Sequence, residues 1–235
     1  MLIEELSPYF INITKINDLC DVELKINDKF ITSNKQIDIK PISHIKHEYK
    51  FMIPKENDKL FWCYYMIIYG EIEYQMQENK NILFEKNKKI ELVMKMRNNK
   101  NIIKHYKLTT IADVETNLSS DRLLSLPVFF LLLIIEEKNI VYMKKKCFYK
   151  SFMNDSDIIY LINQNYGLCE INKKQFDKIK DENLEITSLS KPIKSMSAYK
   201  LDDLKYICNK LSIQREEKIN KKDLYEQIVQ YFSHF

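Results

Sequence analysis

Residues 58–69, with the sequence DKLFWCYYMIIY, decide how this chain folds. Apolar side chains fall on nearly every side of a helix built from this stretch, a pattern typical of a helix buried in a protein interior. Asp58 can cap its start by accepting early backbone N–H groups, and Gly70 can end it in a left-handed conformation. We predict that this helix forms the centre of the core, with Trp62 and Tyr65 as its anchors.

The overall composition is that of a globular protein. The chain has 235 residues, of which 45% are hydrophobic and 12% aromatic, so it can build a sizeable core in one large domain or two smaller ones. It has only two glycines and is rich in lysine, isoleucine, asparagine and tyrosine, a bias that resembles the product of an AT-rich genome. The net charge of +4 therefore permits an anionic partner without demanding one.

The cysteines and the apolar segments indicate a cytoplasmic protein with no membrane insertion. The five cysteines are widely separated and form no CxxC pair, so free buried thiols in a reducing compartment explain them best. Residues 1–5 are acidic where a signal peptide would be basic. The most apolar run, residues 123–135, is shorter than the ~20 residues that span a bilayer. We expect it to be a buried helix.

A strongly basic helix is expected at residues 84–106, with a break near Asn98 and Asn99. Residues 85–107 hold eight lysines and arginines against two glutamates, a net charge of +6. The basic face either follows a phosphate backbone or is the solvated face of a lysine-rich chain, and the second interpretation is favoured. The apolar face is expected to comprise Ile90, Val93, Met94, Ile102 and Ile103.

The rest of the body predicts one more long helix and a small sheet. The helix should cover residues 121–138 with Ser120 as its N-cap, and Pro127 should kink it or mark its first turn. Residues 109–119 form a helical or looped connection before it. Alternating and continuous apolar runs predict the strands. The strands are expected at residues 21–26, 37–40, 140–143, 146–149, 158–162 and 166–171. A short polar helix is expected after them, at residues 172–180.

We therefore predict an α+β fold, in which a mainly helical body with a small antiparallel sheet precedes a C-terminal helix-loop-helix module. The body covers residues 1–180 and is either one unit or two subregions, 1–115 and 116–180. Residues 181–196 are polar and lack a core pattern, so they are expected to be a linker. The module comprises residues 197–235.

The C-terminal module consists of two short amphipathic helices joined by a charged loop. The first is expected at residues 199–211 with Ser197 as its N-cap. The second should start at Asn220, where Asp223 completes a likeness to a capping box. Two such helices close only a very small core, so the module should lean on the body or stay mobile. The facing stripes are Leu201, Leu204, Ile207, Cys208 and Leu211, and Leu224, Ile228, Tyr231 and Phe232.

The module resembles a SAP motif. The likeness rests on the pattern L-x-x-L-K-x-x-C-x-x-L of residues 201–211 and K-K-x-L-x-x-x-I of residues 221–228. SAP modules are helix–extended loop–helix units that bind double-stranded DNA through the second helix and the loop before it. The loop here, residues 212–219, lacks the glycine that this pattern usually carries. The resemblance implies that the DNA-binding residues are Lys205, Arg215, Lys218, Lys221 and Lys222.

A second resemblance concerns the whole chain. The order of an apolar helix, a hairpin flanked by lysines and a SAP-like end is similar to that of uncharacterised proteins of nucleocytoplasmic large DNA viruses. It implies a viral factory or virion setting, with other viral proteins as partners, and supplies no activity. Our first expectation is a non-enzymatic protein that binds double-stranded DNA. The alternative is a virion or structural component whose C-terminal helices dock a protein partner.

No residue pattern predicts catalysis, a metal or a cofactor. The chain has no glycine-rich phosphate loop, no HExxH and no GxSxG. His44 and His47 lack a third ligand, so we interpret them as loop histidines. Cys63 is either a nucleophile partnered by His105 or a buried structural thiol, and the second is favoured. A nuclease site assembled from scattered carboxylates stays open as an alternative. We assign no catalytic residue, metal ligand or cofactor.

Overall fold

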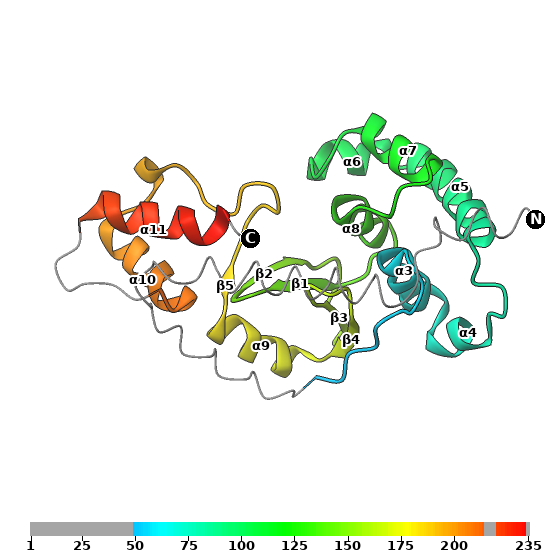
Figure 1. Ribbon diagram of the computed structural model, residues 1–235, viewed down its shortest axis with the longest axis horizontal. Coiled ribbons are helices and arrows are strands. Elements are labelled where there is room, and N and C mark those ends of the chain that lie inside the picture. The colour runs from blue at the N-terminus through cyan, green and yellow to red at the C-terminus, as the bar shows by residue number, and fades with distance from the viewer. Residues whose placement is uncertain (1–48, 214–219, 234–235) are drawn as a thin grey trace, which may run out of the picture. The chain divides into compact units, whose positions relative to one another are not determined.

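The structure of the chain is a computed structural model, which describes residues 49–213 and 220–233 (Figure 1). All of these residues belong to one compact unit. The two strands and the histidine pair expected before residue 49 lie outside the described residues.

The described residues form an α+β fold, as predicted. Within them, none of the helices combines the length and the apolarity that a membrane crossing requires. The helices are α3 (Lys59–Tyr69), α4 (Glu71–Met76), α5 (Ile82–Asn98), α6 (Lys100–Tyr106), α7 (Ile111–Ser119), α8 (Leu126–Ile135), α9 (Lys173–Glu182), η2 (Met196–Ala198), α10 (Leu201–Leu211) and α11 (Lys221–Ser233). The strands are β1 (Ile140–Lys144), β2 (Cys147–Ser151), β3 (Ile159–Ile162), β4 (Leu168–Ile171) and β5 (Leu184–Glu185).

Helix α3 belongs to the main core, as predicted. Its first turn is capped by Asp58, whose Oδ1 accepts the Phe61 N–H at 3.2 Å. Trp62 and Tyr65 are both buried. Gly70 ends the helix at φ 94° and ψ 157°, a positive-φ conformation that favours glycine but is not the left-handed one we predicted. The reason is that Gly70 is also the N-cap of α4, which follows at once.

The basic helix is broken at Asn99 into α5 and α6, as predicted. The apolar face of α5 differs from the predicted one, because Ile90 and Met94 are 50% and 58% exposed. The buried face is set by contacts with α7 and with the start of α3, which the local pattern does not contain. The side chains that α5 buries are Lys89, Leu92, Val93 and Met96.

The helix expected before the sheet starts later than predicted. Pro127 lies in the first turn of α8, so the second alternative for this proline is confirmed. Ser120 is not its N-cap and instead ends α7. The intervening chain is held out of the helix because the Leu124 N–H donates to Asp58 Oδ2 at 2.8 Å, and because proline lacks the N–H that a helix interior requires.

The sheet is mixed, which corrects the prediction of an antiparallel sheet. Its strand order is β4-β3-β1-β2-β5, and the pairs β1–β2 and β3–β4 are antiparallel as expected. The pairs β1–β3 and β2–β5 are parallel. The end of β2 lies beside the start of β1, and residues 152–158 carry the chain past that start to the other edge of β1, where β3 begins and runs parallel to it. Asn139 holds this crossover, since its Oδ1 accepts the Met153 N–H at 2.7 Å.

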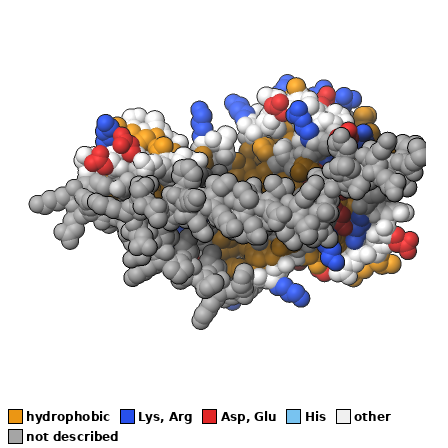
Figure 2. Space-filling view, viewed as in Figure 1, with side chains coloured by type: hydrophobic (Ala, Val, Ile, Leu, Met, Phe, Trp, Pro, Cys, Tyr) orange, Lys and Arg blue, Asp and Glu red, His pale blue; other side chains and the backbone are white. Residues whose placement is uncertain are grey.

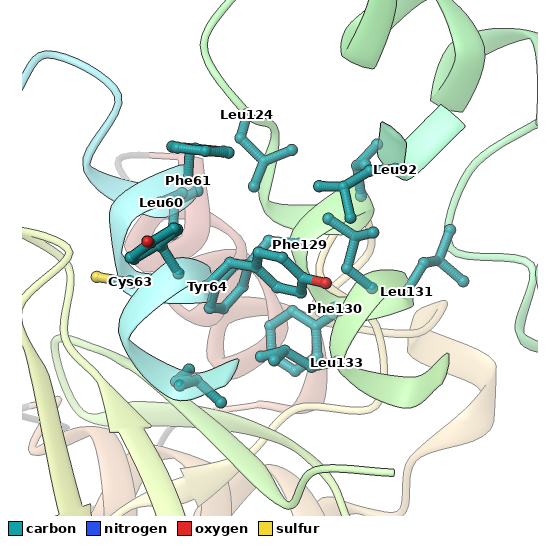
Figure 3. Close-up of a cluster of buried hydrophobic side chains, with 14 of the residues drawn as sticks. Leu60, Phe61, Cys63, Tyr64, Leu92, Leu124, Phe129, Phe130, Leu131 and Leu133 are labelled. Carbon is teal, nitrogen blue, oxygen red and sulfur yellow. The ribbon is translucent and has the colours of Figure 1, made fainter. Parts of the chain in front are cut away.

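The two faces of the sheet bury different helices. Ile140 and Tyr142 of β1 belong to the cluster of α3 and α8, whereas Val141 belongs to the cluster of α9, as side-chain alternation along a strand requires. Figure 1 shows α9 on one side of the sheet and α3 and α8 on the other. The side chains of α3 and α8 labelled in Figure 3 are Leu60, Phe61, Cys63, Tyr64, Phe129, Phe130, Leu131 and Leu133.

Candidate nucleic-acid interface

Helices α10 and α11, which we call the C-terminal module, close a small core of their own. Leu204, Cys208 and Leu211 of α10 are buried, as are Leu224 and Ile228 of α11. Both predicted stripes are therefore confirmed at their central positions. The leucine that opens α10 is the exception, because its side chain is exposed.

The caps of the two helices match the prediction in one case only. Helix α10 begins after Lys200, whose N–H donates to Asp203 Oδ2 at 2.7 Å. Ser197 is not its N-cap: it lies in η2, and its hydroxyl bonds to a neighbouring serine. Helix α11 begins as predicted, since Asn220 Oδ1 accepts the Asp223 N–H at 2.9 Å. An Asn cap of this kind satisfies one of the free N–H groups at a helix start.

The C-terminal ends of α10 and α11 meet at one place, the turn between β1 and β2. Lys146 Nζ donates to Ser212 Oγ at 2.5 Å, directly after α10. The Lys146 N–H donates to the hydroxyl of Tyr231, near the end of α11, at 3.4 Å. One lysine of the body therefore contacts the same end of both helices.

The N-terminal ends of α10 and α11 meet at Lys194. Its N–H donates to the Tyr199 hydroxyl at 3.0 Å, and its carbonyl accepts from the Tyr225 hydroxyl at 2.9 Å. The two helices therefore run in the same direction.

The C-terminal module is docked on the sheet, so the expectation that it leans on the body is confirmed. Cys147 of β2 and Ile186 are buried in the same cluster as the stripes of α10 and α11. Lys210 Nζ donates to the Asp181 carbonyl at the end of α9, where the helix dipole favours a cation. Residues 181–196, which we expected to be a polar linker without a core pattern, thus supply β5 and a buried isoleucine.

Lys221 and Lys222 form the start of α11, directly after the Asn220 cap. Lys222 is exposed, and its Nζ lies 3.8 Å from Glu226 Oε1. An exposed pair at this helical spacing contributes only ~0.3–0.5 kcal/mol, so a phosphate can compete with the glutamate. Lys221 is half-buried, and Asp223 in the same turn offsets part of the positive charge.

The structure places only one of the other three residues that we predicted to bind DNA. Lys205 lies on α10, and its Nζ is 3.6 Å from Asp202 Oδ1 in another exposed pair. Arg215 and Lys218 lie outside the described residues. The structure therefore brings Lys221 and Lys222 together at one helix start and places Lys205 on the neighbouring helix.

Sequence reasoning did not find Lys146 and Lys194, the two residues whose hydrogen bonds connect the corresponding ends of α10 and α11. Each acts through atoms far from it along the chain: Lys146 and Tyr231 are 85 positions apart, and Lys194 and Tyr225 are 31 apart. Tyr231 belongs to the predicted apolar stripe of α11, whereas Tyr225 does not. Nothing in that pattern indicated what their hydroxyls would bond.

The basic character of α5 is largely compensated by carboxylates, four from other parts of the chain and one from α5 itself. Figure 2 shows basic and acidic side chains interspersed over the region of α5 and α7. This arrangement favours the interpretation of an ion-paired, solvated face over that of a phosphate track. The ion pairs are Lys86–Asp121, Lys88–Glu91, Lys89–Asp58, Lys95–Glu136 and Arg97–Glu115.

Cys63 is a buried structural thiol. Its Sγ donates to the Tyr166 carbonyl at 3.2 Å, and burial, together with the nearby Asp58 carboxylate, raises the pKa of the thiol to about 12. A thiol with so high a pKa holds little of the thiolate that acts as a nucleophile. His105 packs against Tyr106 instead.

Within the described ranges, no group of three or more His, Cys, Asp or Glu side chains is placed to hold a metal ion. No family model, curated protein or solved structure matches this chain. The functional argument therefore depends on the geometry of the C-terminal module.

Proposed function

We propose that this chain is a non-enzymatic DNA-associated protein that binds double-stranded DNA through the C-terminal module. The observation that carries the proposal is the arrangement of two amphipathic helices in the same direction, with lysines at the start of the second. The SAP-like pattern of residues 201–228 supports it, because such modules bind DNA with the second helix and the preceding loop. The residues assigned to DNA contact are Lys205, Arg215, Lys218, Lys221 and Lys222.

The proposed mechanism is neutralisation of backbone phosphates with little reading of the base sequence. Lysines at a helix start are suited to this role, because the free N–H groups there favour an anion. Each phosphate contact changes the slope of log K against log salt by roughly −0.9. Five contacts would therefore give a slope near −4.5, and binding should be weak at physiological salt.

The proposed setting is a viral factory or a virion, where other viral proteins would be further partners. This part of the proposal is supported by the resemblance of the chain to proteins of nucleocytoplasmic large DNA viruses. The abundance of lysine and asparagine, typical of AT-rich genomes, points the same way.

The direct test is the double variant Lys221→Glu/Lys222→Glu, assayed by fluorescence anisotropy with a labelled duplex at low salt. We expect the slope of log K against log salt to become less steep by about 1.8. The affinity should drop by roughly tenfold or more, because two phosphate contacts become repulsive. The matched control is Lys173→Glu/Lys174→Glu. Those lysines open α9 in the same tetrapeptide, INKK, after the Asn172 cap.

Two outcomes would contradict the proposal. One is a Lys221→Glu/Lys222→Glu variant that binds duplex as tightly as the parent, and the other is an equal loss in the α9 control. The first would favour the alternative, a module that docks a protein partner. That alternative is supported by three exposed apolar side chains of the module: Leu201, Tyr206 and Val229.

A further inference from the structure

Helix α5 presents an apolar stripe that no described residue covers. Leu83, Ile90 and Met94 are 66%, 50% and 58% exposed, and Asn87 lies exposed between them. The buried face of α5 points the other way, toward α7 and α3. Exposed apolar side chains that are aligned along one helix indicate an interaction surface, whereas single apolar residues scattered over a surface do not.

The spacing of this stripe is that of a coiled-coil seam. Positions 83, 87, 90 and 94 alternate in steps of four and three, so Leu83 and Ile90 occupy d positions and Asn87 and Met94 occupy a positions. An asparagine at a single a position is a known device for fixing register and oligomeric state, because its amide pairs with the same amide in the partner. The polar interruption therefore fits the seam.

The charges beside the seam specify the partner. Lys86 occupies a g position and Glu91 the e position five residues later. When two copies of α5 lie parallel and in register, Lys86 of one copy faces Glu91 of the partner subunit. An antiparallel pair would instead set the Asn87 amide against an apolar d residue and leave it without a partner.

We propose that α5 pairs in parallel with α5 of a second copy of this chain, about a two-fold axis. The pairing would bury Leu83, Ile90 and Met94 and set Lys86 opposite Glu91 of the partner subunit. Within one chain these groups now form exposed pairs, Lys86 with Asp121 at 2.8 Å and Glu91 with Lys88 at 2.9 Å. Exposed pairs are worth little, so exchanging them for pairs between copies is readily reversible.

Charge reversal at the flanks tests the proposal by sedimentation velocity over a range of protein concentrations. The parent should change from monomer to dimer as concentration rises, because a seam of four positions is short. Lys86→Glu alone and Glu91→Lys alone should each stay monomeric, since each sets like charges opposite each other. An equal mixture of the two variants should recover the dimer, because every facing pair then has opposite charges.

A second pair of variants tests the apolar seam. Ile90→Ser/Met94→Ser should abolish dimerisation without unfolding the chain, which circular dichroism will check. The matched control is Ile72→Ser/Met76→Ser on α4, whose side chains are 74% and 70% exposed. It should dimerise like the parent.

The proposal is overturned by a parent that stays monomeric at the highest concentration. It is also overturned by a mixture of Lys86→Glu and Glu91→Lys that is no heavier than either variant, or by a control that dissociates as fully as the seam variant. The variants leave the C-terminal module untouched, so their outcome is independent of DNA binding.

Discussion

Asp58 bonds three separate parts of the chain: the first turn of α3, the segment before α8, and α5. Its Oδ1 caps α3, and its Oδ2 accepts both the Leu124 N–H at 2.8 Å and the Lys89 ammonium at 2.5 Å. Lys89 Nζ also donates to the Arg122 carbonyl at 3.0 Å. The two charged side chains are only 2% and 6% exposed. A charge so buried is tolerated only while its partner is present.

Replacing Asp58 should therefore be severe. Asp58→Ala leaves Lys89 buried without its counter-charge and removes the carboxylate that accepts the Phe61 and Leu124 N–H groups, so we expect a loss of about 3–5 kcal/mol in the free energy of unfolding. Urea denaturation measures it. The control is Asp121→Ala, which breaks the exposed pair with Lys86 and should cost less than about 1 kcal/mol. Equal costs for the two variants would show that the buried pair has no special role.

At the scale of elements, features that depend on residues close together in the sequence were predictable. Features that depend on residues far apart in the sequence were not. The Asn220 cap and the break at Asn99 depend on neighbouring residues and were predicted, and the proline start of α8 was one of the two alternatives given for Pro127. The loss of Ser120 as a cap depends on Asp58, which captures a backbone N–H 66 positions away. The predictions of a purely antiparallel sheet and of the apolar face of α5 were wrong for the same reason, because both features depend on residues distant in the sequence. The lysines of the candidate site were visible locally, whereas the direction of α10 and α11 was not.

Asn139 is a buried residue that bonds the crossover responsible for the mixed sheet. It is buried, it accepts the N–H groups of Met153 and Asn154, and its amide donates to the Asn154 carbonyl. Asn139→Ala leaves two part-buried hydrogen bonds unmade, so we expect a cost at the lower end of the about 1–3 kcal/mol per group that a buried backbone group without a partner carries, measured by urea denaturation. Asn163→Ala is the control, because Asn163 also accepts two N–H groups but is itself only half-buried. A control variant that is the more destabilised of the two would refute this role for Asn139.

At the scale of the whole molecule, the C-terminal module shares its core with the sheet. Cys147 and Ile186 pack with the stripes of α10 and α11, and Lys146 and Lys210 bond the module to β2 and α9. Binding of a partner to this module is therefore expected to stabilise the sheet as well as α10 and α11. Removing residues 191–235 would also uncover the buried Cys147, so point variants are the cleaner probes of function.

Ile186→Ala tests whether module and sheet are coupled in stability. Ile186 is 2% exposed, and truncating it should cost about 2–5 kcal/mol by leaving a cavity between β5 and the module. Hydrogen exchange should then speed up in α10 and α11 more than in α3 and α8. Ile179→Ala is matched in residue type and burial, but Ile179 packs on the α9 face of the sheet. It should accelerate exchange around α9 and leave the pattern in α10 and α11 unchanged. Unaltered protection of α10 in the Ile186 variant would mean that the module holds its own structure, and the sheet would then have no part in positioning its lysines.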